Sequence, residues 1–185
     1  MKIKSCIVCK NKKLIKYLNL GSQPLANNLS KNVNVKNYPL EVCFCSNCFH
    51  NQLNYEVKKE KLFSKYLYLS SQSKTLQDHF IDANKKYIKL FRLSKKSTII
   101  DVGSNDGIGL RHFKDKKFKK IYGIEPAKNI AKIANSNGTK TINSFLNYKV
   151  SKKFKNQVDL IMASNVFAHN KDVGNLLDLM INMLK

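Results

Sequence analysis

The sequence predicts an α/β protein in which a small, metal-stabilised N-terminal module precedes a parallel sheet with helices on its faces. Two observations support this fold class. All five cysteines lie within the first 48 residues, whereas short β-branched runs alternate with helical segments after about residue 97. Such alternation is typical of a parallel sheet. We therefore expect a zinc-binding module at residues 1–55, a helical connector at 56–96 and a sheet domain at 97–185.

The N-terminal module is rich in loops and has little apolar material of its own. It holds two of the three prolines and short extended runs such as YPLEVCF at residues 38–44. A core this thin needs a cross-link to be stable. Cys6 and Cys9 form one CxxC pair, and Cys45 and Cys48 form a second. In a chain that we expect to be cytoplasmic, such pairs indicate metal binding before disulfides.

Two CxxC pairs allow four thiolates to converge as the tetrahedron that zinc requires. A site closed by four sulfurs leaves no position for water or substrate, so the zinc is expected to be structural. The intervening residues 10–44 are more numerous than in a standard zinc ribbon, but loop closure costs grow only logarithmically with length. A redox-active CxxC is disfavoured because neither pair opens a helix in a βαβ context. Cys43 and His50 flank the second pair and are the rival ligands.

The connector is predicted to contain a short helix, a polar turn at residues 70–73 and then a long helix. Apolar residues at spacings of three and four support the long helix, and no proline or glycine interrupts them. These residues are Leu76, Phe80, Ala83, Tyr87 and Leu90. We interpret Phe80 and Tyr87 as packing residues of the core.

The sheet domain is predicted from its alternating elements. The strands are expected at residues 98–102, 120–125, 139–144 and 158–164, and the helices at 107–115, 126–138 and 171–185. Pro126 stands near the first position of its helix and Gly138 stands at the end, which are the positions that these residues favour.

The turn after the first predicted strand carries the clearest chemical signal. The strand leads into Asp101-x-Gly103-x-Asn105-x-Gly107, and Glu125 follows at the end of the next strand. Such glycines let the backbone approach a nucleotide-like ligand, and an acid at the second strand tip can hold a ribose diol, as in Rossmann-like sheets. The spacing does not fit the dinucleotide GxGxxG. It is closer to the glycine loop of S-adenosylmethionine sites, with Asn105 replacing a glycine because asparagine tolerates left-handed φ.

The composition argues against two classes of partner. The formal net charge of +22 would suit nucleic acid, but only Arg92 and Arg111 are arginines, and readers of nucleic acid rely on arginine. A nucleic-acid-binding zinc protein therefore stays a minor hypothesis. No stretch approaches the roughly 18 uninterrupted apolar residues of a membrane span, and the N-terminus lacks a signal-peptide core. We expect a cytoplasmic protein without a membrane partner.

Several motifs occur together in one order along the whole chain. They are the Cys6/Cys9 pair, LGSQPLAN at 20–27, the Cys45/Cys48 pair followed by NQL, YLYLSSQS at 66–73, DVGSNDG at 101–107, GIEPAKNIAKIA at 123–134 and SNVFAHNKD at 164–172. In this order they resemble the sugar C-methyltransferases with an N-terminal zinc-binding domain, which act in deoxysugar and antibiotic-sugar biosynthesis.

The resemblance implies the first half of a Rossmann-like class I methyltransferase sheet and an S-adenosylmethionine cofactor beside the structural Zn²⁺. It implies C-methylation of a nucleotide-linked keto-deoxysugar, which needs a base, donors to an enolate oxygen and in-line placement of the methyl group. The cofactor-binding residues so implied are Asp101, Gly103, Ser104, Asn105, Asp106, Gly107, Glu125, Pro126 and Asn165.

Two residues are implied near the sugar. His169 is expected as an electrophile or acid–base partner, and the alternative is a histidine that only satisfies a helix start. Tyr68, with Tyr66 and Ser71, matches the substrate-side stretch of the family, although packing alone would explain both tyrosines. His79 also matches the family's spacing and receives no role.

The chain is about half the length expected for the family, so we expect a truncated or split member. The fourth strand would then leave an apolar edge with unpaired backbone groups, which a polypeptide supplying the C-terminal half could cover. The alternative function is a non-catalytic, zinc-containing binding subunit.

Overall fold

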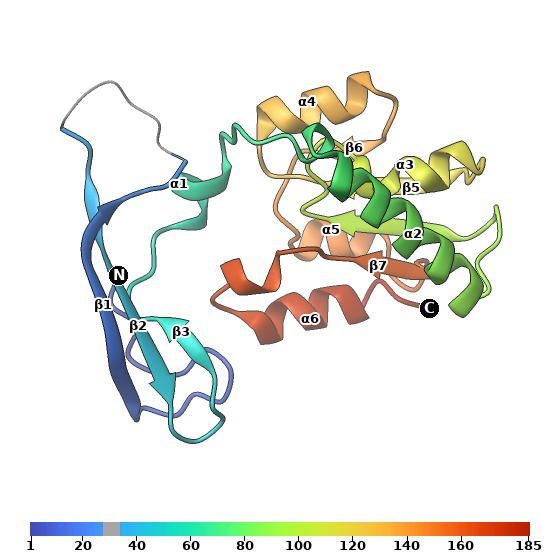
Figure 1. Cartoon of the computed structure of the whole chain (residues 1–185). Helices are drawn as coiled ribbons and strands as arrows, with labels where there is room; N and C mark the ends of the chain where they lie inside the picture. Colours follow the sequence, from blue (N-terminus) through green and yellow to red (C-terminus); the bar gives the residue numbers. More distant parts are fainter. Residues whose placement is uncertain (28–33) are drawn as a thin grey trace. The chain divides into compact units, whose positions relative to one another are not determined.

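The computed structural model describes residues 1–27 and 34–185 (Figure 1). These residues form two compact units. The first contains residues 1–62 with 170–174, and the second contains residues 63–169 with 175–185. The residues expected as a separate connector, 56–96, are therefore divided at Leu62, and most of them belong to the unit that holds the parallel sheet.

The first unit is built on an antiparallel sheet with the strand order β1-β2-β3. The strands are β1 (Leu14–Pro24), β2 (Asn37–Cys45) and β3 (Asn51–Leu53), followed by the short helix α1 (Lys59–Phe63). Leu14 lies opposite Cys45, so the start of β1 and the end of β2 meet where the two cysteine turns are. Among the described residues of this unit, the buried apolar side chains are Cys6, Cys43 and Cys45, which confirms how thin its core is.

The second unit is built on a parallel sheet with the order β6-β5-β4-β7. Its strands are β4 (Thr98–Val102), β5 (Lys120–Ile124), β6 (Thr141–Ile142) and β7 (Leu160–Met162). The helical segments are η1 (Ser70–Gln72), α2 (Lys74–Leu90), α3 (Ile108–Asp115), α4 (Lys128–Ser136), α5 (Tyr148–Lys153), η2 (Phe167–His169) and α6 (Val173–Ile181). This arrangement confirms the predicted α/β class, and α5 is an element that the sequence patterns did not predict.

Neighbouring residues of β4 face opposite sides of the sheet because side chains alternate along a strand. Ile99 packs with Leu110 and Phe113 of α3 and with partly buried residues of α2. Ile100 packs into a second cluster that contains residues of α5 and α6, such as Val150 and Leu179. Helices therefore cover both faces of the sheet, as Figure 1 shows, and all five residues of β4 are buried.

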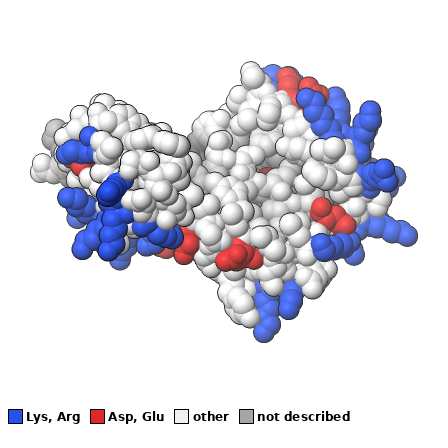
Figure 2. All heavy atoms as spheres, turned by 90° about the horizontal axis from the view of Figure 1, so that it is seen from below, with Lys and Arg blue, Asp and Glu red and all other residues white. Residues whose placement is uncertain are grey.

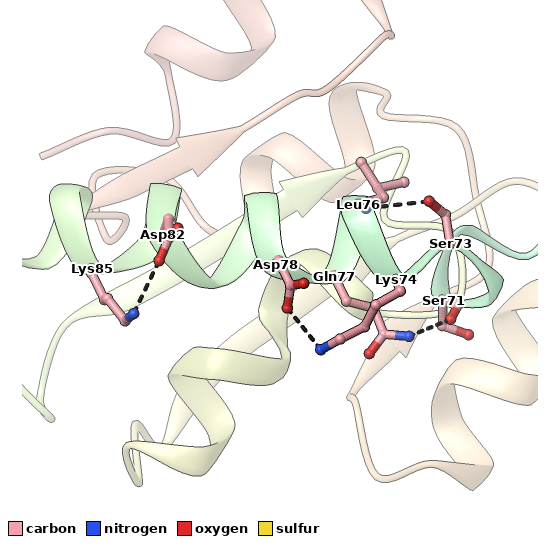
Figure 3. A network of polar contacts seen from close by, with 8 residues as sticks. All are labelled: Ser71, Ser73, Lys74, Leu76, Gln77, Asp78, Asp82 and Lys85. Carbon is pink, nitrogen blue, oxygen red and sulfur yellow. Dashed lines mark hydrogen bonds and ion pairs between the residues drawn. The ribbon is translucent and has the colours of Figure 1, made fainter.

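Helix α2 begins with a side-chain cap and carries ion pairs on its exposed face (Figure 3). The Ser73 hydroxyl accepts a hydrogen bond from the Leu76 amide at 3.2 Å, which satisfies a free donor of the first turn. The predicted apolar stripe is wrong at its end, because Leu90 is 70% exposed. The buried face instead includes Asn84, whose side-chain nitrogen donates to the carbonyl oxygen of Gly109 at 2.8 Å and so ties α2 to α3.

The fourth predicted strand is shorter than expected and forms an edge of the described sheet. β7 covers only Leu160–Met162 and pairs with β4 alone. The sequence predicts an edge with unpaired backbone groups, but the residues just before β7 are paired. The Val158 amide donates to the Met183 carbonyl at 2.9 Å, and the Lys185 amide donates to the Val158 carbonyl at 3.1 Å. The last residues of the chain thus run parallel to the entry into β7.

The lysine and arginine side chains do not form a single patch on the face drawn in Figure 2. Figure 2 shows the lysine and arginine side chains in several separate groups on the face that it presents. Of the described residues, no helix is both long and apolar enough to cross a membrane.

Candidate functional site

Four thiols converge in the first unit. Cys6 Sγ lies 3.6 Å from Cys48 Sγ, and Cys9 Sγ lies 3.6 Å from Cys45 Sγ. All four sulfur atoms lie within 4.8 Å of one another. A tetrahedral zinc with Zn–S bonds of about 2.3 Å separates its sulfurs by about 3.8 Å, so the cluster has the size and the ligand type of a four-sulfur zinc site.

The two cysteine turns have matching backbones. In the first turn the Lys10 amide donates to the Cys6 carbonyl at 3.0 Å, and in the second the Phe49 amide donates to the Cys45 carbonyl at 2.9 Å. Lys10 and Phe49 both adopt a left-handed φ, 63° and 61°. This uncommon conformation in two non-glycine residues closes each turn so that both thiols point to one centre.

The four thiols influence one another's ionisation. The Asn11 backbone amide lowers the pKa of the Cys9 thiol to about 6. The His50 amide also favours the Cys48 thiolate, but burial and the neighbouring thiols raise the pKa of Cys48 to about 12. Four thiolates so close together repel one another, and a divalent metal ion removes that repulsion.

Cys43, one rival ligand, lies apart from this cluster in the described structure. It is 2% exposed and pairs with Gln52 across β2 and β3. Burial raises the pKa of its thiol. Neither Cys43 nor His50 belongs to the group of converging ligand atoms that residues 1–27 and 34–185 form.

In the second unit, the turn after β4 is built from left-handed residues. Gly103, Asn105 and Gly107 have φ values of 70°, 48° and 84°. A Cβ atom at Gly107 would lie 2.7 Å from Thr139 Oγ1, so this position requires glycine for both its φ and its space. Gly109 in the first turn of α3 leaves room for the Asp101 carboxyl, which a Cβ atom there would meet at 2.5 Å.

Glu125 fixes this turn to the end of β5. Its Oε2 accepts a hydrogen bond from the Asn105 amide at 2.9 Å, and its Oε1 accepts one from the Ala127 amide at 2.8 Å. The carboxyl group is 6% exposed, and burial raises its pKa, although the two amides counteract that shift. Each oxygen keeps a second lone pair for a further donor.

Asp101 lies at the carboxyl end of β4, next to Gly123 in the register of the sheet. It is 4% exposed, and burial together with the nearby charge of Glu125 raises its pKa to about 8. An acid in this state readily becomes a carboxylate when a cationic group binds beside it.

The stretch Tyr66–Ser71 lies on the glycine turn. Asn105 accepts a hydrogen bond from the Ser70 amide at 2.9 Å and donates one to the Tyr68 carbonyl at 3.1 Å. Asp106 Oδ2 accepts from the Ser71 amide at 3.2 Å. Asn105 and Asp106, which are predicted to face a cofactor, therefore also hold this stretch in position.

A cavity of about 310 Å³ opens at the carboxyl end of β4, beside the glycine turn. It brings together five of the predicted residues, Asp101, Gly103, Ser104, Asn105 and Asn165. Two buried polar atoms, Ser104 Oγ and Asp106 Oδ1, have no hydrogen-bond partner among the described residues. Buried polar groups are rarely left unpaired. Asp106 is not part of the cavity lining, and Ser104 Oγ lies against Gly123 of β5, where a Cβ atom would clash with it.

Other predicted residues are not part of the cavity lining. Tyr68 is 46% exposed and contacts the turn through its carbonyl group. His169 stands in η2, with its ring centroid 5.3 Å from that of Phe63. The lining also does not include Asp106, Gly107, Glu125 or Pro126. The Glu125 carboxyl instead accepts hydrogen bonds from the Asn105 and Ala127 amides.

The cavity also contains residues to which the sequence patterns assign no role in a site. Leu76, His79 and Phe80 reach it from α2, and Ser70, Ile108, Gly109 and Ser164 complete the lining. The sequence indicates that these helical residues lie together, because the spacing of Leu76, His79 and Phe80 places them on one side of a helix. The helical spacing predicts Phe80 as a core residue only, whereas it also forms a wall of the cavity.

A parallel sheet with a glycine turn and acids at two adjacent strand ends defines the second unit as a nucleotide-ligand-binding α/β fold. Comparison with known families agrees with this class. A zinc-binding domain family matches residues 6–63, and a methyltransferase domain family matches residues 74–185. The chain belongs to this methyltransferase domain family, and the predicted pairing of a zinc-binding domain with a methyltransferase domain is confirmed.

Individual relatives support the same family. The C-methyltransferase NovU of Streptomyces niveus is 26% identical over 183 residues, which cover 95% of this chain and 43% of that protein. The chain thus spans less than half the length of this relative.

Solved structures of methyltransferases share the fold. An S-adenosyl-L-methionine-dependent methyltransferase from Methanococcus maripaludis matches with a TM-score of 0.53 and 17% identity, covering 65% of this chain and 61% of that one. The plantazolicin methyltransferase BamL, in complex with S-adenosylhomocysteine (SAH), matches with a TM-score of 0.51 and 19% identity, covering 63% of this chain and 45% of its own.

Proposed function

We propose that the chain is the zinc-binding and cofactor-binding part of an S-adenosylmethionine-dependent C-methyltransferase that acts on a nucleotide-linked keto-deoxysugar. The observation that carries the proposal is the turn Gly103–Gly107, held between Asp101 at the end of β4 and Glu125 at the end of β5. The relation to NovU supports the C-methyltransferase assignment, and the order of motifs supports the sugar substrate.

The pocket suits this cofactor chemically. S-adenosylmethionine supplies a methyl group activated by a sulfonium, and it also carries an ammonium group. The buried Asp101 carboxyl, with its pKa raised to about 8, is the group that ionises to neutralise such a cation. Glu125 lies outside the cavity lining, next to the glycine turn, and keeps lone pairs for ribose hydroxyls.

C-methylation beside a ketone requires a base that removes a proton and donors that stabilise the enolate oxygen. Two histidines are candidates for the base. We assign His169 a place near the sugar from its motif, and we add His79 because it lines the cavity beside Asn105 and Asn165. Tyr68 is assigned to the substrate side through its hydroxyl group.

The four-cysteine cluster is proposed to bind one structural Zn²⁺ through Cys6, Cys9, Cys45 and Cys48. All four ligand positions would be sulfur, which leaves none for catalysis. The ion would replace the hydrophobic core that this unit lacks and so keep its strands in register.

The test combines cofactor binding with methyl transfer. We would titrate the zinc-loaded chain with S-adenosylmethionine by calorimetry, and then follow transfer of a ¹³C-labelled methyl group to a nucleotide-linked 4-keto-deoxysugar by NMR. We expect binding at micromolar concentrations. The variants His169→Phe, His79→Phe and Tyr68→Phe should keep binding, and loss of transfer identifies the residue that acts on the sugar. Tyr148→Phe is the control, because Tyr148 is 71% exposed and far along the chain from these motifs.

The outcomes separate the two hypotheses. Transfer that one histidine variant abolishes supports the enzyme. Cofactor binding without transfer supports the alternative, a zinc-containing binding subunit. A folded, zinc-loaded chain that does not bind S-adenosylmethionine would contradict the proposal for this pocket.

A further inference from the structure

A second hollow of about 400 Å³ lies in the same unit and shares no lining residue with the first cavity. It is formed by the second half of α2, the turn that follows, and the end of α3. Its lining consists of Lys85, Ile88, Leu93, Ser94, Lys95, His112, Lys116 and Phe118. This volume is within the range of small-molecule sites in proteins.

The hollow combines apolar walls with a basic rim. Ile88, Leu93 and Phe118 supply the apolar surface, and Phe118 is fixed by an edge-on contact with the ring of Phe113. Lys85 is paired with Asp82 at 3.0 Å (Figure 3). The ammonium groups of Lys95 and Lys116 form no ion pair with any of the residues that the structure describes, so their charge is available to a ligand.

His112 adds a buried nitrogen to this basic group. The side chain is 9% exposed, and its Nε2 atom has no hydrogen-bond partner among the described residues. Burial lowers the pKa of His112, and the charges of Lys116 and Lys85 lower it further, whereas Asp115 and Asp82 raise it. The lowered pKa keeps the imidazole neutral beside the lysines, but a buried ring nitrogen without a hydrogen-bond partner is unfavourable, and a polar group of a ligand would relieve it.

We propose that this hollow is a binding site for a small organic anion with an apolar body, such as an aryl phosphate or aryl carboxylate. The apolar walls would hold the body, and Lys95 and Lys116 would hold the anionic group with the His112 ring beside it. The buried, unpaired imidazole is what distinguishes this site from a group of surface lysines. The site is independent of the proposed methyltransferase function, because none of its residues takes part in that chemistry.

The test uses phenyl phosphate as the probe. We would titrate the full, zinc-loaded chain by calorimetry and follow the imidazole NMR signals, with the His112 signal identified from the His112→Phe variant. Saturable binding of one molecule with a shift of the His112 signal is expected. Inorganic phosphate, which lacks the ring, and benzyl alcohol, which lacks the charge, should each bind at least fivefold more weakly.

Charge-removal variants locate the site. Lys116→Gln and Lys95→Gln should each weaken phenyl phosphate binding at least threefold. Lys132→Gln, which removes the same charge from α4, should leave it unchanged. The proposal is overturned if inorganic phosphate binds as tightly as phenyl phosphate, or if all three lysine variants behave alike. The lysine variants decide the question even if His112→Phe does not fold.

Discussion

The backbone amide of Asn105 donates a hydrogen bond to Oε2 of Glu125 at 2.9 Å, which joins the turn after β4 to the residue after β5. Through this bond, the acid at the end of the second strand stabilises the turn even without a bound ligand. The carboxylate holds the left-handed Asn105 in place, and the same asparagine holds Ser70 and Tyr68 through its side chain.

Glu125→Gln tests this relationship. An amide side chain can accept from only one of the two backbone donors, Asn105 or Ala127, and its NH₂ group opposes the other. We expect a loss of about 1–3 kcal/mol in the free energy of unfolding and at least a tenfold weaker binding of S-adenosylmethionine. Urea denaturation and calorimetry measure the two effects. Asp178→Asn, on the exposed part of α6, should change neither, and equal behaviour of the two variants would contradict the assigned role.

Gly107→Ala tests the steric requirement of the turn. The added Cβ atom would meet Thr139 Oγ1 at 2.7 Å in a residue whose φ is 84°. We expect destabilisation of about 2–4 kcal/mol from strain and overpacking together. Gly174→Ala is the matched control, because its nearest neighbour is 3.9 Å away and it lies in helix α6. There the change should be neutral or slightly stabilising, and thermal unfolding of the two variants compares them directly.

The order of the elements and the position of the glycine turn could be predicted because they depend on local patterns. The alternating apolar runs predicted each strand of the parallel sheet, and Gly103 and Gly107 adopt the positive φ that the motif requires. The four cysteines converge because each CxxC turn is a local structure and β1 pairs with β2 beside them.

Features that depend on tertiary contacts were not predictable in the same way. Asn84 is fully buried because its side chain donates to the Gly109 carbonyl in the first turn of α3, which no periodicity in α2 reveals. Leu90 is exposed at the last residue of α2, while Tyr87, Ile88 and Leu93 around it pack against the sheet cluster. His79 lines the cavity because α2 crosses the carboxyl end of β4, and that crossing is a property of the assembled layers.

Cys45→Ser and Cys43→Ser separate the proposed ligand from its neighbour. Both side chains are buried on β2, but only Cys45 belongs to the converging cluster. Cys45→Ser should abolish tight binding of one zinc ion per chain and unfold the first unit, since the ion replaces its core. Cys43→Ser should keep the zinc and lose only about 1–2 kcal/mol through a buried hydroxyl. Metal content by atomic emission after gel filtration measures the difference, and loss of zinc in Cys43→Ser would show that the ligand set is different.

The raised pKa of Asp101 makes the stability of the ligand-free protein depend on pH. In the unfolded chain this carboxyl loses its proton at about pH 4, whereas in the folded chain it keeps the proton up to about pH 8. Between these values the folded state binds more protons than the unfolded state. The free energy of unfolding therefore falls as pH rises, by at most about 1.4 kcal/mol per pH unit, and levels off above about pH 8. The raised pKa of Glu125 acts with the same sign.

Asp101→Asn removes this dependence because asparagine resembles the neutral acid at every pH. In urea titrations with saturating zinc, the variant should be more stable than the wild type at pH 8, and the difference should shrink toward pH 5. Parallel curves across this range would mean that Asp101 is already ionised in the folded chain. In that case the carboxylate would meet a cationic cofactor without releasing a proton, and the affinity for S-adenosylmethionine would not change with pH. If the curves converge as expected, that affinity should rise with pH up to about 8, because binding then no longer has to displace the proton.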